Sequence, residues 1–359
     1  MPNAYPSTVT VGVGALTIEE VVAVARYGAT VEISAEALEE VASTRDRVEE
    51  LAQDPTPVYG ISTGFGALAR RHIPEEMRAQ LQLSLVRSHA AGTGPEVEEE
   101  VIRALMLLRL STLCTGRTGV RPVVVETYAK ALNAGIVPVV REYGSLGCSG
   151  DLAPLAHCAL ALLGEGEVRV GGELKDAGEA LAAAGIEPLE LREKEGLALI
   201  NGTDGMLGQL CLAITDLRAA AKTADIATAM TVEGLLGTLV VFADDLQQLR
   251  PHPGQADAAA NILQVAEGSQ ILEAALEEFK KNQVQDAYSV RCAPQVAGGF
   301  RDTLAHTAQV AERELAAAVD NPVVAKDGRV VSNGNFHGAP VAYALDFLAI
   351  VTADLASIS

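Results

Sequence analysis

The chain has 359 residues, of which 49% are hydrophobic, and its formal net charge is -20 at pH 7. Because domains usually span roughly 100–200 residues, this length allows about two domains with a sizeable buried core. The excess of acidic groups repels phosphate backbones and anionic lipid surfaces, so the composition excludes nucleic acid and membranes as expected partners.

Residue composition predicts a mainly α fold. Aromatic residues make up 4% of the chain and Trp is absent, whereas small residues that favour helices are abundant and permit close helix packing. Residues 1–6 lack the basic start and apolar stretch of a secretory signal. The five cysteines are widely spaced and form no C-x-x-C pair, which favours the reducing cytoplasm as the location.

Glycine-rich loops alternate with helical patterns in the first half of the chain. Residues 8–13 are typical of a strand, and Ser34 is typical of the residue that caps the start of a helix. Further helices are expected at residues 75–90, 97–115 and 152–163. The glycine-dense segments at residues 59–66 and 144–150 are expected to be loops.

Two short β hairpins are expected at the periphery of the fold. A Gly-Gly pair lies within residues 168–174, and an Asp-Gly pair lies within residues 323–331. Both dipeptides favour the tight turns that join antiparallel strands.

Long helices are expected in the second half of the chain. Residues 206–241 are apolar on nearly all sides, as in the centre of a large bundle, while residues 285–295 are expected to form a loop. The helical pattern of residues 341–359 stops without a terminating glycine, so we expect a chain shortened at its C-terminus. The expected domains are residues 1–200, a helical domain with the glycine-rich loops, and 201–359, a bundle of long helices.

Residues 144–151 (GSLGCSGD) carry the clearest chemical signal. A phosphate-binding loop would need Lys and Ser or Thr after its last glycine, where this chain has Asp151. A serine-hydrolase elbow would need glycine two places after the nucleophile, but Gly150 follows Ser149 directly. An ordinary loop and an internal cyclisation remain open.

Cyclisation would join the amide nitrogen of Gly150 to the carbonyl carbon of Cys148. Loss of the Ser149 hydroxyl as water would then leave an exocyclic alkene on a five-membered ring, which is an electrophile. Glycine suits the ring position because a Cβ atom would obstruct the close approach of the two backbone segments.

The wider sequence is similar to the aromatic amino-acid ammonia-lyases that use a methylidene-imidazolone group. Residues 144–157 (GSLGCSGDLAPLAH) resemble the family signature, although most members have Ala where this chain has Cys148. Four further blocks agree in the family's order: residues 59–66 (YGISTGFG), 194–203 (KEGLALINGT), 284–296 (VQDAYSVRCAPQV) and 333–338 (NGNFHG).

This resemblance implies a mainly α, long-helix bundle of the fumarase/aspartase-like type with small peripheral hairpins. It also implies a homotetramer with shared active sites. The implied cofactor is 4-methylidene-imidazol-5-one, formed from Cys148-Ser149-Gly150 without a diffusible cofactor. The implied reaction is non-oxidative elimination of ammonia by a carbon–nitrogen lyase.

Two positions resemble the histidine-specific members of the family. Ser88-His89 stands where phenylalanine and tyrosine enzymes carry Phe-Leu or His-Leu, and His337 stands where phenylalanine enzymes tend to have Gln. The resemblance therefore implies L-histidine as substrate and trans-urocanate as product. His89 can hydrogen-bond an imidazole through either ring nitrogen.

The resemblance implies roles for ten residues. Tyr59 is the expected base and Arg291 the expected clamp for the substrate carboxylate, because a guanidinium offers paired donors. The expected catalytic residues are Tyr59, Cys148, Ser149, Gly150, Asn201, Tyr288 and Phe336, and the expected substrate-binding residues are His89, Gln285 and Arg291. The remaining histidines lack ligand spacing, so no metal is expected.

Other functions stay open at this point. The chain can be a non-catalytic helical scaffold that retains lyase motifs. Within the enzyme class, it can be a phenylalanine or tyrosine ammonia-lyase, or an aminomutase that shares the electrophile.

Overall fold

A computed structural model describes residues 5–53, 58, 60–64, 71–145, 150–282 and 284–358. Contacts between residues divide the chain into two compact units. The first comprises Met1–Leu212 and Ala311–Ala342, and the second comprises Ala213–Val310 and Tyr343–Ser359. The domain division at residue 200 stays a prediction.

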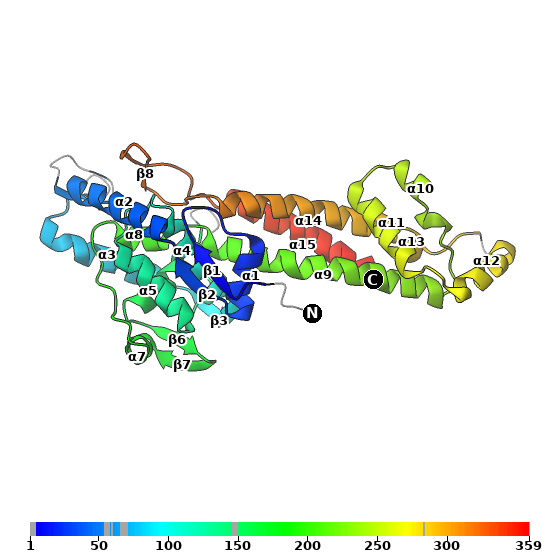
Figure 1. The fold of residues 1–359 in the computed structure, drawn as a ribbon, viewed down its shortest axis with the longest axis horizontal. Coiled ribbons are helices and arrows are strands. Elements are labelled where there is room, and N and C mark those ends of the chain that lie inside the picture. The colour runs from blue at the N-terminus through cyan, green and yellow to red at the C-terminus, as the bar shows by residue number, and fades with distance from the viewer. Residues whose placement is uncertain are drawn as a thin grey trace. The chain divides into compact units, whose positions relative to one another are not determined.

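Helices make up most of the first unit (Figure 1). They are α1 (Ile18–Tyr27), α2 (Ala35–Gln53), α3 (Glu75–His89), α4 (Glu99–Cys114), α5 (Pro122–Asn133), α6 (Leu152–Leu162), α7 (Ala177–Ala183) and α8 (Glu195–Ile200). The start of α9 (Asp204–Gly234) and the end of α14 (Ala293–Leu315) also belong to this unit. The mainly α fold expected from composition is therefore confirmed.

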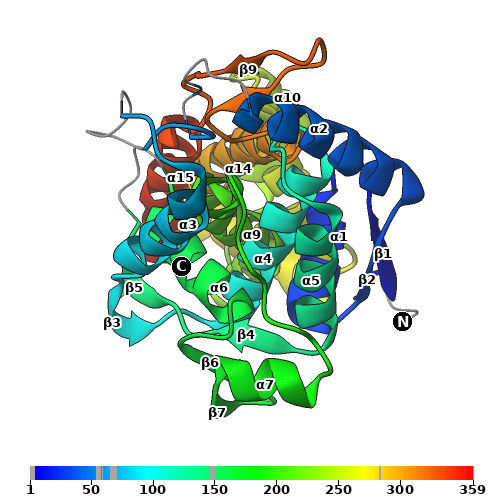
Figure 2. The same ribbon diagram turned by 90° about the vertical axis from the view of Figure 1, so that its left-hand side faces the viewer.

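The core of the first unit is built around α4. Every residue from Ala104 to Cys114 is buried, including the charged Arg109. Helices α1, α2, α5 and α6 all pack against α4, and Figure 2 shows α4 among them. A helix that is apolar on nearly all sides is typically buried in this way. Packing on all sides holds the middle of α4 in place, and loops adjoin its two ends.

Short strands lie around these helices. Strands β1 (Thr8–Val11) and β2 (Thr30–Ile33) pair in parallel, and β3 (Thr93–Glu96) pairs antiparallel with β5 (Arg141–Tyr143). The other strands are β4 (Ile136–Pro138), β6 (Glu167–Val170), β7 (Glu173–Asp176), β8 (Val323–Val324) and β9 (Val330–Val331). The antiparallel pairs β6–β7 and β8–β9 confirm both expected hairpins.

Local sequence signals fix several helix ends. The Ser34 hydroxyl accepts a hydrogen bond from the Ala37 amide at 3.1 Å, so Ser34 caps α2 as predicted. At α1, Thr17 and Glu20 form a reciprocal capping box, and Gly28 ends the helix in the left-handed conformation. These caps satisfy backbone groups that a helix leaves unpaired.

The second unit contains most of α9 and α14, and these long helices run beside α15 (Ala339–Ile358) (Figure 1). Shorter helices follow one another between α9 and α14. They are the 3-10 helix Val240–Phe242, α10 (Asp244–Gln248), α11 (Pro253–Val265), α12 (Gln270–Asn282) and α13 (Tyr288–Arg291).

One prediction for this unit is wrong in part. Residues 285–295 were expected to form a loop, but they contain α13 and the first turn of α14. Val290 on α13 is buried in an apolar cluster with Val232, Phe242 and Ile262. Packing of one apolar side chain thus stabilises a helical turn that is too short to show a periodic pattern.

Two apolar segments match a membrane span by length and composition alone, Glu195–Gly234 and Ala339–Ile358. In the first, 89% of the apolar window is buried inside the protein, and in the second 22% is buried. Burial of this kind is usual for the core helix of a soluble protein, so the first segment is explained by the fold.

Neighbouring glycines on α14 provide a matched test of helix packing. A Cβ atom at Gly298 would lie 2.5 Å from the backbone of Gln255, whereas one at Gly299 meets nothing within 4 Å. We expect Gly298→Ala to lower the free energy of unfolding by about 1–3 kcal/mol through overpacking. Gly299→Ala should raise it by up to about 1 kcal/mol, because alanine favours the helix. Urea unfolding followed by circular dichroism measures both, and equal effects would contradict the close α11–α14 approach.

Candidate active site

Gly150 lies against the backbone of Gly202. Its φ is +72°, and a Cβ atom built there would lie 2.0 Å from the carbonyl oxygen of Gly202. The same oxygen accepts a hydrogen bond from the Asp151 amide at 2.8 Å. Both the conformation and the space at position 150 therefore require glycine. Cys148 and Ser149 lie outside the described residues.

Asp151 ties the segment after Gly150 to the start of α9. One carboxylate oxygen accepts hydrogen bonds from the amides of Gly205 at 2.8 Å and Met206 at 3.0 Å. Burial raises the pKa of Asp151 to about 6, although these two amides favour the charged form and oppose the shift. The carboxylate thus compensates unpaired amides at the helix start.

Asn201 follows the last residue of α8 and is almost fully buried. Its side-chain amide donates a hydrogen bond to the Asn321 carbonyl at 3.0 Å, and its own carbonyl accepts one from Arg109 at 2.9 Å. Both ends of the residue are therefore held. Gly202, the contact of Gly150, is its immediate neighbour, so the structure brings Asn201 and Gly150 together.

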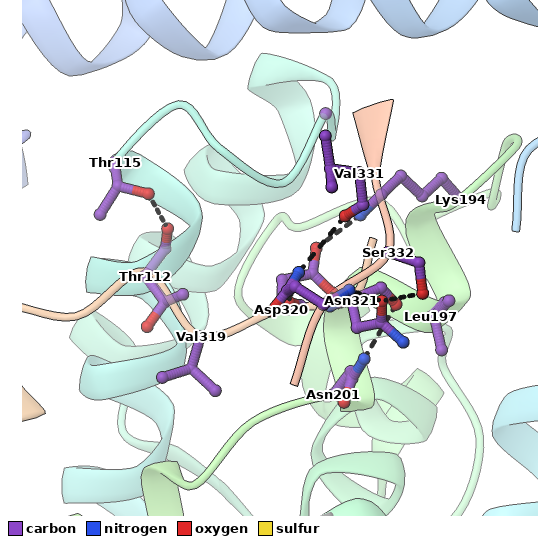
Figure 3. Close-up of polar contacts among 12 residues, drawn as sticks. Thr112, Thr115, Lys194, Leu197, Asn201, Val319, Asp320, Asn321, Val331 and Ser332 are labelled. Atoms are coloured by element: carbon purple, nitrogen blue, oxygen red, sulfur yellow. Dashed lines mark hydrogen bonds and ion pairs between the residues drawn. The ribbon is translucent and has the colours of Figure 1, made fainter. Parts of the chain in front are cut away.

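Two buried ion pairs surround Asn201. Lys194 and Asp320 lie 2.5 Å apart and both side chains are fully buried (Figure 3). Arg109 lies 3.3 Å from Asp204, and these side chains are also buried. Burial lowers the pKa of Lys194, while attraction to Asp320 opposes that shift. Burial raises the pKa of Asp204, and Arg109 opposes it.

Phe336 and His337 lie in the loop between β9 and α15. Phe336 is half-buried, whereas His337 is exposed and its Nδ1 accepts a hydrogen bond from the Ala339 amide at 3.2 Å. The loop is anchored upstream, where the Asn333 side chain accepts a hydrogen bond from the Asn335 amide at 2.8 Å.

His89 is the last residue of α3 and is half-buried. Its Nδ1 lies 2.9 Å from the Leu85 carbonyl. Nδ1 also lies 3.0 Å from the Ser88 hydroxyl. The tautomer with the proton on Nδ1 would donate to the Leu85 carbonyl and leave Nε2 as an acceptor. The next loop is anchored by His157 on α6, whose Nε2 accepts a hydrogen bond from the Gly92 amide at 3.1 Å.

Tyr59 lies outside the described residues, but the loop next to it is well ordered by hydrogen bonds. The Val58 carbonyl accepts from the amides of Ile61, Ser62 and Thr63 at 3.0–3.3 Å. Thr63 also forms a bridge with His72. These contacts fix the segment that follows the expected base.

The second unit carries the remaining expected residues. Gln285 and Tyr288 are exposed, and the Arg291 guanidinium carbon lies 4.4 Å from the centre of the Tyr288 ring. This is the geometry of a cation–π contact. The buried Arg291 Nε has no hydrogen-bond partner within the part of the chain that the structure describes.

No metal centre is found among the described residues, where no group of three or more His, Cys, Asp or Glu is suitably placed.

Comparison with known proteins identifies the family. The family model for aromatic amino acid lyases matches residues 16–359. The chain belongs to the aromatic amino acid lyase family. The lyase class and the fold expected from the motifs are therefore confirmed.

Several relatives share a single name. Histidine ammonia-lyase of Streptomyces coelicolor is 63% identical over 98% of this chain, and that of Streptomyces griseus is 64% identical over 98%. The chain spans 69% and 68% of the length of these two relatives.

Solved structures of the same family superpose closely. Tyrosine aminomutase from Streptomyces globisporus has a TM-score of 0.90 at 40% identity, covering 98% of this chain and 69% of that one. Histidine ammonia-lyase from Trypanosoma cruzi has a TM-score of 0.87 at 38% identity, covering 98% and 65%.

The residues that hold Asn201 were not predicted from the sequence. Arg109 stands inside the apolar run LMLLRLSTLC, and a lone charge in such a run signals a buried partner. Lys194 begins the block at residues 194–203, but the resemblance to the family implies no role for it. Asp320 and Asn321 gave no signal, since their partners are more than 100 residues away in the sequence.

The titration of Asp151 should change the free energy of unfolding with pH. Because its folded-state pKa is about 6 and an unfolded Asp titrates near pH 4, the folded state binds the extra proton between these values. Its contribution is therefore present below about pH 4 and is lost as the pH rises through 6. Between pH 4 and pH 7, we expect the free energy of unfolding of Asp151→Asn to increase relative to that of wild type by on the order of 3 kcal/mol. Urea unfolding at both values measures the gap, and a constant gap would refute the shift.

The Gly150–Gly202 contact has a matched control. Gly185 has a similar φ of +69° but open space where a Cβ would lie. Alanine at either position should cost roughly 1–2 kcal/mol through the left-handed conformation. Gly150→Ala should cost more because its Cβ also displaces the Gly202 carbonyl. Urea midpoints of the two variants test this. Equal midpoints would show that the Gly202 carbonyl moves away from the new Cβ atom at little cost in free energy.

Proposed function

We propose that this protein eliminates ammonia from L-histidine to give trans-urocanate. The observation that carries the proposal is 63% identity with histidine ammonia-lyase of Streptomyces coelicolor over 98% of the chain. His89 supports it, because the tautomer that donates from Nδ1 to the Leu85 carbonyl has Nε2 as an acceptor for the N–H of a substrate imidazole.

The prosthetic group of the family fits the described residues around position 150. The structure has no room for a Cβ atom at position 150. Position 150 therefore takes glycine, the residue that formation of a ring through the amide nitrogen also requires. We assign 4-methylidene-imidazol-5-one to Cys148-Ser149-Gly150. When formed, this group supplies an electrophile for the substrate amine, which is otherwise a poor leaving group.

The other proposed roles belong to side chains of the chain itself. Tyr59 is the proposed base for the weakly acidic β-proton of the substrate. Arg291 binds the substrate carboxylate with paired donors, and its unpaired Nε leaves a donor for this. Asn201 and Gln285 hydrogen-bond ring and substrate. Tyr288 adds a polar contact and Phe336 packs beside them.

A homotetramer with shared active sites and a cytoplasmic location complete the proposal. The described cysteines support a reducing compartment, since no disulfide joins Cys114, Cys158 or Cys292 to another described cysteine.

An aminomutase is the alternative with a specific observation behind it, the close superposition on tyrosine aminomutase. An aminomutase returns the amine to the neighbouring carbon, whereas a lyase releases it. Product analysis after incubation with L-histidine, L-tyrosine and L-phenylalanine separates these activities, because only a lyase accumulates free ammonia in step with the alkene.

The decisive measurement is the ultraviolet absorbance of urocanate formed from L-histidine. We expect wild-type protein to form it and Ser149→Ala to form none, because alanine has no hydroxyl to lose during ring formation. The variant should keep the helical circular dichroism spectrum of wild type. Folded wild-type protein without product would refute the proposal and favour a non-catalytic scaffold.

A further inference from the structure

Four residues form a closed circuit of contacts that the proposed reaction does not explain: Lys194, Asp320, Asn321 and Asn201. Lys194 stands immediately before α8 and Asn201 immediately after it. Lys194 pairs with Asp320, and the Asn201 side chain donates to the carbonyl of the next residue, Asn321. Both ends of this one short helix are therefore fastened to two consecutive residues (Figure 3).

Backbone conformation and hydrogen bonds restrict the residues of this circuit. Lys194 adopts a left-handed conformation, with φ of 68°, which is uncommon for a residue other than glycine. The second oxygen of Asp320 accepts a hydrogen bond from the Asn321 amide at 2.7 Å. The Asp320 carboxylate therefore binds the lysine and also holds the backbone N–H of Asn321, the residue whose carbonyl receives the Asn201 amide.

The circuit also reaches the loop of Phe336. The Asn321 side-chain oxygen accepts hydrogen bonds from the Ser332 hydroxyl at 3.0 Å and the Asn333 amide at 2.9 Å. The Asn333 side chain in turn donates to the Asp320 carbonyl at 3.1 Å. One pair of residues, Asp320 and Asn321, thus positions two segments that carry proposed site residues.

An ion pair buried this completely is a weak source of stability. Removing two charges from water costs several kcal/mol each, and apolar replacements of similar volume are often neutral or stabilising. Geometry is a better reason for the pair, because a short charge-assisted contact restricts both partners to one arrangement.

We propose that Lys194 is a positioning residue for the reaction: its ion pair with Asp320 sets the orientation of the Asn201 side-chain amide. The inference rests on the proposed function, in which Asn201 contacts ring and substrate. Lys194 itself touches neither, so it acts through Asn201.

The test begins with Lys194→Met, which keeps the aliphatic stem and removes the charge. We expect kcat for urocanate formation to fall about 100-fold, as small misplacements of catalytic groups can cause, with KM changed much less. The matched control is Arg301→Met, because Arg301 pairs with the buried Asp225 and contacts no member of the circuit. It should lose comparable stability and keep its kcat.

A double-mutant cycle with Asn201→Ala separates positioning from general damage. If Lys194 acts through Asn201, adding Lys194→Met to Asn201→Ala should lower kcat no further. Multiplying kcat losses would overturn the inference.

Two further measurements keep the test decisive. Should Lys194→Met fail to fold, Lys194→Met with Asp320→Asn leaves no unpaired buried charge and keeps an oxygen for the Asn321 amide; this pair should fold and still show the low kcat, and wild-type kcat would overturn the inference. A crystal structure of the folded variant should show the Asn201 amide beyond about 3.5 Å from the Asn321 carbonyl. An unmoved amide would overturn the inference even if wild-type protein formed no urocanate, an outcome that refutes only the proposed function.

Discussion

The contact between two glycines determines how the first unit is arranged. Gly150 meets the Gly202 carbonyl on one side, and on the other side a Cβ at Gly202 would lie 2.1 Å from the Asp204 carboxylate and 2.4 Å from the Arg109 guanidinium. Two backbone segments and a buried ion pair therefore meet where these two glycines lack side chains. Larger residues at either position would separate the segment after residue 149 from Asn201, so the candidate site depends on this contact.

Buried charge follows from the same close approach. Where backbone segments meet without side chains, their carbonyl groups need donors, and Arg109 supplies them to Asn201 and Val319. A buried guanidinium then needs a counter-charge, which Asp204 provides. The buried stretch of α4 from Ala104 to Cys114 thus carries one charged residue, Arg109, because the loops beside it have polar groups to satisfy. The ion pairs are a consequence of how tightly the loops pack.

The sequence predicted the elements whose signals are local. Ser34 caps α2, and the Gly-Gly and Asp-Gly turns join β6–β7 and β8–β9. The first part of the apolar run at residues 206–241 lies in α9, which ends at Gly234. The helical turn α13 was missed, because four residues are too few for a periodic pattern and tertiary packing of Val290 decides its conformation. Pairing of Lys194 with Asp320 joins residues 126 apart, and no local pattern reports such a contact.

For the candidate site, too, local motifs could predict some features and not others. Motif resemblance could select Asn201 and Gly150, because each stands in a block that the family shares, but it could not explain why the two blocks must meet. The structure supplies that reason: the residue after Asn201 offers its carbonyl to Asp151 and leaves no room for a side chain at position 150. Glycine at position 150 is then required twice, by the backbone conformation and by the position of Asn201. A substitution there would disturb the proposed ring formation and the orientation of the Asn201 amide together. The proposed prosthetic group is thereby linked to the buried charges that hold Asn201.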